Sequence, residues 1–278
     1  MAPMTIGCDR QITEERRRAL AHYLTANVLA AEFICPQYRE CRSSHAEKFY
    51  EGQLHHVGRF YDLRFDGLPL RVVIVGQEYG HAPSRVDSQA RYDMILSSGL
   101  DCRFKAESGY EARNPHMRGT TNVLRLLFGV PLGTDHDSEF MMIDGERVQL
   151  FDGFALVNYL LCSAVANDDK ARGMATPMMM KNCQAHFREA IRILEPSVIV
   201  VQGKTFWEWV SGAFDSVRQH ADQVYRATLE PTQILVAVFT HPSSRFPHNW
   251  GANDRTPYLL ETVAPSIASI REQLLGVR

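Results

Sequence analysis

The stretch RVVIVGQEYGH, residues 71–81, determines the fold class. Its four consecutive β-branched residues, Val72 to Val75, stand before Gly76 and a run of polar residues. A short, continuous apolar run of this kind is typical of a parallel strand that is buried on both faces. The polar residues that follow are then expected at the carboxyl end of this strand, which is where open α/β sheets bind their ligands.

Three further segments repeat this pattern farther along the chain. The additional apolar runs cover residues 154–157, 198–201 and 234–239. Helical spacing predicts helices over residues 11–31, 122–127, 182–195, 204–214 and about 257–275. Apolar strands that alternate with helices predict the α/β class. We expect a three-layer α/β/α sandwich around a central, mainly parallel four-stranded sheet.

The composition of the 278-residue chain is that of an ordinary globular protein, with 45% hydrophobic and 22% charged residues. This composition argues against disorder, collagen-like repeats and coiled coils. No apolar run approaches the roughly 18–20 residues of a membrane span, and the N-terminus lacks the apolar core of a signal peptide. We therefore expect a cytoplasmic protein.

The chain shows no internal repeat and no low-complexity linker, so we expect one domain over residues 1–278. Within it, residues 1–60 form an N-terminal helical segment with cysteines, and residues 81–114 form a long polar insertion. The net charge of −2 gives no overall basic field, but a local basic face is sufficient to bind DNA. Six cysteines are too few for a disulfide scaffold, so they indicate a metal, a cluster, catalysis or plain burial.

Polar motifs follow three of the predicted strands, and their order is informative. They are GQEYGH at 76–81, NYLLC at 158–162 and THPSS at 240–244. In this order, they resemble the motifs of the uracil-DNA glycosylase superfamily, and the resemblance covers most of residues 72–260. The pair Gln77–Glu78 makes the first motif closer to that of the cluster-free uracil enzymes, which reads Gly-Gln-Asp-Pro-Tyr-His.

The other blocks resemble the iron–sulfur class of this superfamily most closely. Asn158, Cys162 and Asn167 stand in the register of its second strand motif. The residues at the spacings of its next block are Cys183, Pro196 and Gly203. The segment PHMRGTTNVLRLL looks like the family's region between these motifs, with His116 where a base-stacking Phe is usual.

The resemblance implies a [4Fe–4S] cluster on four thiolates. The implied ligands are Cys35, Cys41, Cys162 and Cys183. Five residues separate the first pair, in place of the family's Cys-x2-Cys. Tetrathiolate coordination also suits zinc, and the sequence leaves that alternative open. The remaining cysteines, Cys8 and Cys102, are left as bystanders.

The resemblance also implies catalytic roles at the strand ends. An enzyme that acts on a base in duplex DNA must first extrude it from the stack. Cleavage of the glycosidic bond then places positive charge on the sugar and negative charge on the departing base. Glu78 is expected to stabilise the sugar and orient a water, and His241 is expected to donate to the base oxygen.

Further residues are expected to bind the base and the DNA. The carboxamide of Asn158 suits reading of a pyrimidine edge, and His116 is expected to stack on the flipped ring. The backbone at Gln77 and Ser243 is expected to hold phosphate or base. Two residues, Arg245 and Phe246, stand where the family inserts a wedge into the duplex.

The substrate is left open between two classes of base. Gly80 stands where the cluster-free enzymes have the Tyr that crowds C5 of the base, so a C5 substituent has room. With the insertion at 81–114, this favours a hydroxymethylated or glucosylated cytosine of phage DNA and a defence role. Uracil in a repair role is the other possibility. We expect the protein to be a monomer that binds DNA with a damaged or modified base. It would then associate with the nucleoid through DNA. No protein partner is implied.

Two rival functions are compatible with the same residues. One is a non-catalytic DNA-binding protein that kept the glycosylase fold, because fold does not guarantee function. The other is a glycosylase that acts on free nucleosides or RNA. An acid, an Asn and a His at three strand ends argue against loss of activity.

Overall fold

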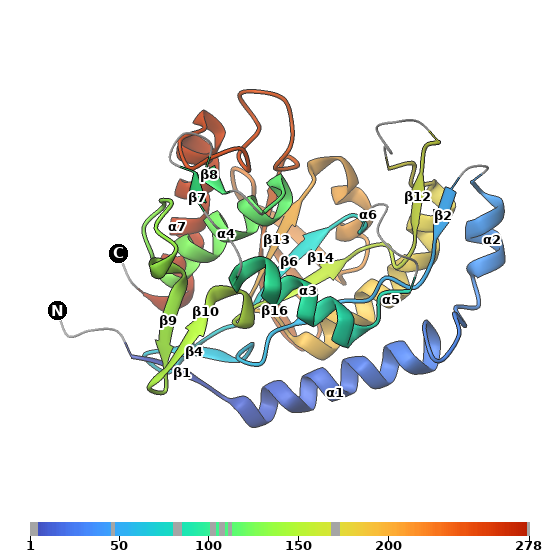
Figure 1. The fold of residues 1–278 in the computed structure, drawn as a ribbon, viewed down its shortest axis with the longest axis horizontal. Coiled ribbons are helices and arrows are strands. Elements are labelled where there is room, and N and C mark those ends of the chain that lie inside the picture. Colours follow the sequence, from blue (N-terminus) through green and yellow to red (C-terminus); the bar gives the residue numbers. More distant parts are fainter. Residues whose placement is uncertain are drawn as a thin grey trace.

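The computed structural model describes residues 5–45, 48–79, 85–100, 104–105, 109–110, 113–167 and 173–276 (Figure 1). The α-helices are α1 (Arg10–Asn27), α2 (Tyr38–Ser43), α3 (Ser88–Leu100), α4 (Pro115–Phe128), α5 (Pro177–Leu194), α6 (Trp207–Ser211) and α7 (Ala264–Leu275). Short 3-10 helices cover Asp137–Glu139, Leu150–Asp152 and Lys204–Phe206, and a π-helical turn at Leu259–Val263 leads into α7. In this part of the chain, no helix is both long enough and apolar enough to span a membrane.

A central sheet of seven strands organises the fold. Its order is β14 (Ser216–Ala221), β15 (Val224–Leu229), β16 (Thr232–Phe239), β13 (Val198–Gln202), β6 (Val72–Gly76), β11 (Ala155–Asn158) and β3 (His56–Val57). β6 is parallel to both β11 and β13, and β13 is parallel to β16. β3 joins one edge and the β15–β14 pair joins the other, all antiparallel.

The prediction of a mainly parallel sheet is confirmed for its centre, but the predicted number of four strands is wrong. The four predicted runs are β6, β11, β13 and β16. The extra strands lack a continuous apolar run, because β14 is largely exposed and β3 has only two residues. A strand that faces solvent needs no apolar run, so the sequence pattern does not mark it.

The smaller strands form separate pairs and a three-stranded sheet. They are β1 (Ile6–Cys8), β4 (Leu63–Phe65) and β5 (Leu68–Leu70) in one sheet, the pair β9 (Phe140–Ile143) and β10 (Glu146–Gln149), the pair β12 (Ser163–Val165) and β2 (Lys48–Tyr50), and the pair β7 (Phe104–Lys105) and β8 (Gly109–Tyr110). The antiparallel pair β9–β10 is a hairpin.

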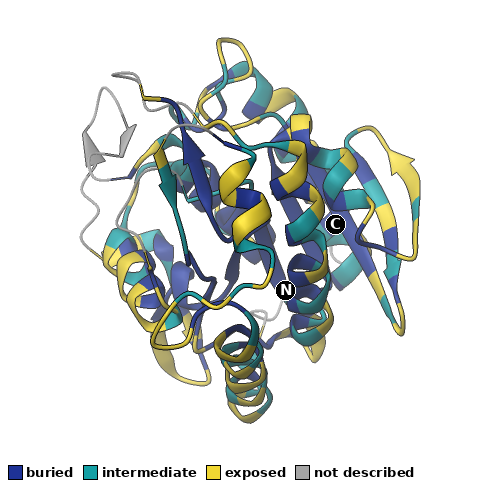
Figure 2. Cartoon of the chain, turned by 90° about the vertical axis from the view of Figure 1, so that its right-hand side faces the viewer, coloured by how far each residue is buried: buried dark blue, intermediate teal, exposed yellow. Residues whose placement is uncertain are grey.

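Helices cover both faces of the central sheet, and each face has its own hydrophobic core. Val73 and Val75 of β6 pack in one core with residues of α1, α5 and α6. Val72 and Ile74 pack in the other core with residues of α4 and α7. This alternation follows from the two-residue period of a strand. Figure 2 shows the buried strands between helices whose outer faces are exposed.

The segment 81–114 is more structured than the predicted polar insertion. Its described part contains α3, which buries Arg91, Tyr92 and Ile95 against the fold. The Tyr92 hydroxyl donates to Oδ1 of Asp152 at 3.2 Å, and the Tyr92 ring stacks on His56. α3 is therefore an anchored wall of the protein.

Close packing at glycines brings α4 to the carboxyl ends of the strands. A Cβ on Gly119 of α4 would lie 2.8 Å from Cγ of Pro242, which leaves no room for a larger residue. Asn114 caps the helix by accepting from the Met117 N–H at 3.0 Å, as N-cap residues commonly do. The loop after β16 is held by Trp250, whose Nε1 donates to the carbonyl of Thr240 at 2.7 Å. The start of α4 and the loop after β16 thus meet above the sheet.

Candidate functional site

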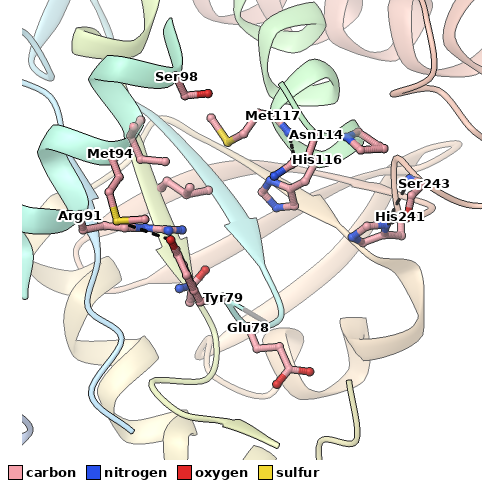
Figure 3. A pocket seen from close by; sticks show the side chains of 14 residues that line it. Glu78, Tyr79, Arg91, Met94, Ser98, Asn114, His116, Met117, His241 and Ser243 are labelled. Carbon is pink, nitrogen blue, oxygen red and sulfur yellow. Dashed lines mark hydrogen bonds between the residues drawn. The ribbon is translucent and has the colours of Figure 1, made fainter. Parts of the chain in front are cut away.

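A cavity of about 670 Å³ lies at the carboxyl ends of β6, β11 and β16 (Figure 3). Its lining residues are Glu78, Tyr79, Arg91, Met94, Ile95, Ser98, Asn114, Pro115, His116, Met117, Leu156, Asn158, His241 and Ser243. The sequence predicted Glu78, His116, Asn158, His241 and Ser243 for one site, and the fold brings these five to one cavity.

His116 reaches the cavity because β6 ends in glycine. A Cβ on Gly76 would lie 2.8 Å from Nε2 of His116 and 3.7 Å from Oδ1 of Asn158. The side-chain amide of Gln202 has one orientation in which both its nitrogen and its oxygen find hydrogen-bond partners. In that orientation, its nitrogen donates to Nε2 of His116 at 3.2 Å. Nε2 is then an acceptor, so the ring proton is on Nδ1. Burial, together with the nearby His241 and Arg91, lowers the pKa of His116 to about 3, so the ring is neutral near pH 7.

The hydrogen bonds of His241 fix its tautomer. The backbone N–H of Ser243 donates to Nδ1 of His241 at 3.2 Å, and the Ser243 hydroxyl lies 2.7 Å from the same atom. A backbone N–H can only donate, so Nδ1 is the acceptor and a neutral ring carries its proton on Nε2. Desolvation lowers the pKa of His241, which favours this neutral form. His241 therefore has an N–H donor beyond its bonds to Ser243.

Asn158 presents an unpaired amide at the end of β11. Only 2% of the residue is exposed, and its Nδ2 has no hydrogen-bond partner among the described residues. A buried donor without a partner costs about 1–3 kcal/mol. A ligand that supplies an acceptor would recover this free energy.

Glu78 belongs to the cavity lining, but its carboxylate is directed away from the two histidines (Figure 3). Oε1 accepts from Nε2 of Gln77 at 3.3 Å and lies against Gly173. Oε2 is buried and without a hydrogen-bond partner in the described part of the chain. Burial raises the pKa of Glu78 to about 7, against the opposing effect of hydrogen bonds with Ala164, Gln77 and Ser163.

The remaining predicted DNA and base contacts do not line the cavity, and one of them lies outside the described residues. Arg245 and Phe246 are both exposed on the loop after β16, and Phe246 is 74% exposed. Gln77 is half-buried, and its carbonyl accepts from the Leu160 N–H at 2.8 Å. Gly80 lies outside the described residues.

Arg91 is a cavity residue that the sequence reasoning did not single out as a site residue. It is 6% exposed, and its guanidinium lies over the Tyr79 ring with Cζ 4.1 Å from the centroid. Its Nε has no hydrogen-bond partner, and no carboxylate pairs with it among the described residues. Burial lowers the pKa of Arg91 to about 10, so it is charged at pH 7. In the sequence it is one of several charges in a polar segment, with no signal to distinguish it.

The four predicted ligand cysteines line a second cavity together. Cys35 precedes α2, Cys41 lies on α2, Cys162 follows β11 and Cys183 lies on α5. Burial is the main cause that raises the pKa of each of these thiols, and proximity to one another raises it further for Cys35, Cys162 and Cys183. Cys8 is on β1 and Cys102 lies outside the described residues. The four cysteines that the resemblance implies as ligands therefore line one cavity.

The surroundings of these cysteines suit thiolate ligands. Backbone N–H groups at Gln37, Gly52 and Leu161 donate to Cys35, Cys162 and Cys183 respectively, which opposes the larger effect of burial that raises the pKa of these thiols. Nδ2 of Asn182 donates to Sγ of Cys41 at 3.5 Å. Hydrogen bonds to the sulfurs are a regular feature of iron–sulfur sites.

His186 joins the cysteine cavity to α1. Its Nε2 lies 3.7 Å from Sγ of Cys35, and its Nδ1 lies 2.9 Å from the Tyr23 hydroxyl. No group of three or more His, Cys, Asp or Glu in the described residues is close enough to hold a single metal ion.

Comparison of the sequence with known protein families and with curated proteins finds no match.

Proposed function

We propose that the chain is a monofunctional DNA glycosylase that flips out a pyrimidine base and hydrolyses its N-glycosidic bond. The observation that carries the proposal is the convergence of His116, Asn158 and His241 on one cavity at the strand ends. Four adjacent parallel strands, β11, β6, β13 and β16, support a uracil-DNA glycosylase-like sheet. Ligands of such open sheets bind at this edge.

The tautomer of His241 suits stabilisation of the departing base. As the glycosidic bond lengthens, negative charge develops on a base oxygen. The Nε2–H of His241 donates to that oxygen, while Ser243 holds Nδ1. His241 is exposed in the described structure, and once a flipped nucleotide covers it and excludes water, one such donor lowers the activation barrier by about 3–4 kcal/mol. Nδ2 of Asn158 donates to an acceptor on the pyrimidine edge, and His116 stacks on the ring.

Glu78 supplies the carboxylate for the sugar and the water. In the described conformation it faces Gly173, so the proposal requires its side chain to rotate toward the flipped nucleotide. The unpartnered Oε2 leaves one oxygen with no hydrogen bond to break. Its raised pKa means that Glu78 must lose a proton to act as the anion.

The wedge and the cluster are proposed in supporting roles. Phe246, exposed beside Arg245, enters the duplex where the base has left. Four cysteines, Cys35, Cys41, Cys162 and Cys183, hold a [4Fe–4S] cluster that ties the segment around α2 to the end of β11 and to α5. The cluster would supply a structural cross-link there.

The proposed substrate is DNA with a modified pyrimidine, and a phage-defence role follows if the base is a hydroxymethylated or glucosylated cytosine. The cavity volume of about 670 Å³ lies in the range of roughly 300–1,000 Å³ that holds drug-sized ligands. This volume is larger than a bare pyrimidine ring requires. We propose that the protein is a monomer that associates with the nucleoid only by binding DNA. Uracil repair is the alternative role for the same chemistry.

The orientation of Glu78 favours a second candidate function, a DNA-binding protein without catalysis. Abasic-site formation separates the two. Duplex and single-stranded DNAs with uracil, hydroxymethyluracil, hydroxymethylcytosine or glucosylated cytosine at one position are incubated with the protein. Excision of any of these bases supports the glycosylase. Tight binding of the DNAs without excision of any base supports the second candidate.

A further inference from the structure

The cavity has two chemically different halves, and the second half has no role in the proposed chemistry. Figure 3 shows His116, Met117, His241 and Ser243 on one side, and Arg91, Met94 and Ser98, which project from α3, on the other. The histidine side, with Asn158, supplies the donors for a pyrimidine ring. The α3 side therefore faces a part of the ligand beyond the ring.

Arg91 makes the α3 half a site for oxygen acceptors. Its guanidinium is buried and charged, and among the described residues it meets the Tyr79 ring but no carboxylate. A buried charge that is neither paired nor hydrogen-bonded is costly. The planar guanidinium offers several N–H donors in a fixed fork, which suits a group with two or more oxygens.

The surroundings of Arg91 restrict where that group comes from. In the proposed complex, the phosphates of the DNA strand would stay at the protein surface, where Ser243 and Arg245 are exposed. Arg91 is 6% exposed and lies on the wall of the cavity, so a substituent on the flipped base reaches it more directly than a phosphate does. Met94 and Ile95 supply apolar contacts beside it, and Ser98 supplies a hydroxyl.

α3 is held rigidly enough to define this half of the cavity. Tyr92, next to Arg91, donates to Asp152 and stacks on His56. At the other end of the helix, a Cβ on Gly99 would lie 2.8 Å from the side-chain amide of Gln149, so the helix packs closely there. Arg91 is thus placed by the fold before any ligand binds.

We propose that Arg91 is a specificity-determining residue that donates hydrogen bonds to an oxygen-rich substituent on C5 of the flipped pyrimidine. This inference rests on the proposed function and assigns the α3 half of the cavity to that substituent. Tyr79 supports the guanidinium from below, and Ser98 adds a further hydrogen bond. Bases without the substituent use only the histidine half.

The test compares Arg91→Met with the wild type on matched duplexes. Methionine keeps an unbranched, apolar side chain beside Tyr79 and removes the N–H donors. The duplexes carry uracil, hydroxymethylcytosine or glucosylated cytosine at the same position. We expect kcat/KM to fall at least 100-fold for the most oxygen-rich base and less than threefold for uracil. Arg218→Met, the same substitution at an exposed arginine of β14 that does not line the cavity, is the matched control and should change each value less than threefold.

The outcomes separate this inference from the proposed function. Equal losses on all bases, no loss on any base, or excision of uracil alone by the wild type would overturn the role of Arg91 and leave the glycosylase in place. Absence of excision from every duplex would overturn the proposed function. Fluorescence anisotropy on the same duplexes then decides the role of Arg91. Tighter binding of the substituted DNA must disappear in Arg91→Met, and binding that ignores the substituent overturns the inference.

Discussion

The imidazole rings of His116 and His241 lie 6.0 Å apart, centroid to centroid, with their planes at 48° to each other. They come from the first turn of α4 and from the loop after β16, which are 125 residues apart in the sequence. Each ring is neutral near pH 7, and each has a proton fixed by a neighbour: Gln202 for His116 and Ser243 for His241. This pair defines the half of the cavity where we place the base.

His241→Ala tests the donor to the departing base. The substitution removes Nε2–H, so the single-turnover rate of excision should fall about 100- to 1,000-fold. Ser243→Ala is the matched control because it retains the backbone N–H that holds Nδ1. Ser243→Ala should lower the single-turnover rate less than tenfold. Comparable losses in both variants would show that the loop, and not the imidazole donor, limits the reaction.

The pH dependence of excision tests the role of Glu78. Its pKa of about 7 means that the carboxylate form is lost as the pH falls through 7. The single-turnover rate should therefore rise with pH up to about 7 and then level off. Glu78→Gln should slow excision by orders of magnitude while DNA binding stays nearly unchanged. A wild-type rate that does not change between pH 5.5 and 8.5 would contradict this role.

The same residue makes a prediction about stability. Because its pKa in the folded chain is above its ordinary value of 4.5, Glu78 favours folding below pH 4.5, and that contribution is lost as the pH rises through 7. At about 1.36 kcal/mol per pKa unit, the buried anion costs roughly 3 kcal/mol above pH 7. Glu78→Gln should raise Tm at pH 8 and have little effect at pH 4.5. Thermal melts at the two pH values measure this difference, and a lower Tm at pH 8 would argue against it.

The cysteine cavity predicts a brown protein. Anaerobically purified protein should contain iron and sulfide at about four each per chain, with broad visible absorbance. Cys162→Ser and Cys183→Ser should lose iron and colour, because both residues are buried in the cavity. Cys8→Ser should keep both, since Cys8 lies on β1 and outside this cavity. Colourless protein with one zinc per chain would show that the cysteines bind zinc and not a cluster.

Phe246→Ala tests the wedge. The ring is 74% exposed, so its loss should leave Tm within about a degree. Excision from duplex DNA should fall at least tenfold, because unstacking a base costs a few kcal/mol, while excision from single strands should change little. Leu68→Ala removes another exposed apolar side chain, on β5 and far from this loop in the sequence, and serves as the control. Equal effects on single-stranded and duplex DNA would rule out a wedge.

The sequence predicted the centre of the fold and much of the site, because both depend on local patterns. A continuous apolar run such as Val72–Val75 marks a buried strand, and polar residues directly after it, such as Asn158 or His241, must lie at the sheet edge. The four cysteines required the resemblance as well, since their spacing alone does not identify a cavity.

Other features depend on tertiary packing and left no local signal. Arg91 resembles the other charges of segment 81–114, and only the packing of α3 shows that it is buried. The Glu78 carboxylate lies against Gly173, which is 95 residues away in the sequence. The exposed strand β14 has no apolar run to reveal it.

Product analysis tests the glycosylase assignment most directly. A duplex with hydroxymethylated or glucosylated cytosine at one position is incubated with excess protein in water enriched in ¹⁸O. Both products are then identified by mass spectrometry. We expect equal amounts of free intact base and of an abasic strand whose sugar carries one ¹⁸O, with both products greatly reduced in His241→Ala. Unchanged DNA after incubation, for this base and for uracil, would contradict it.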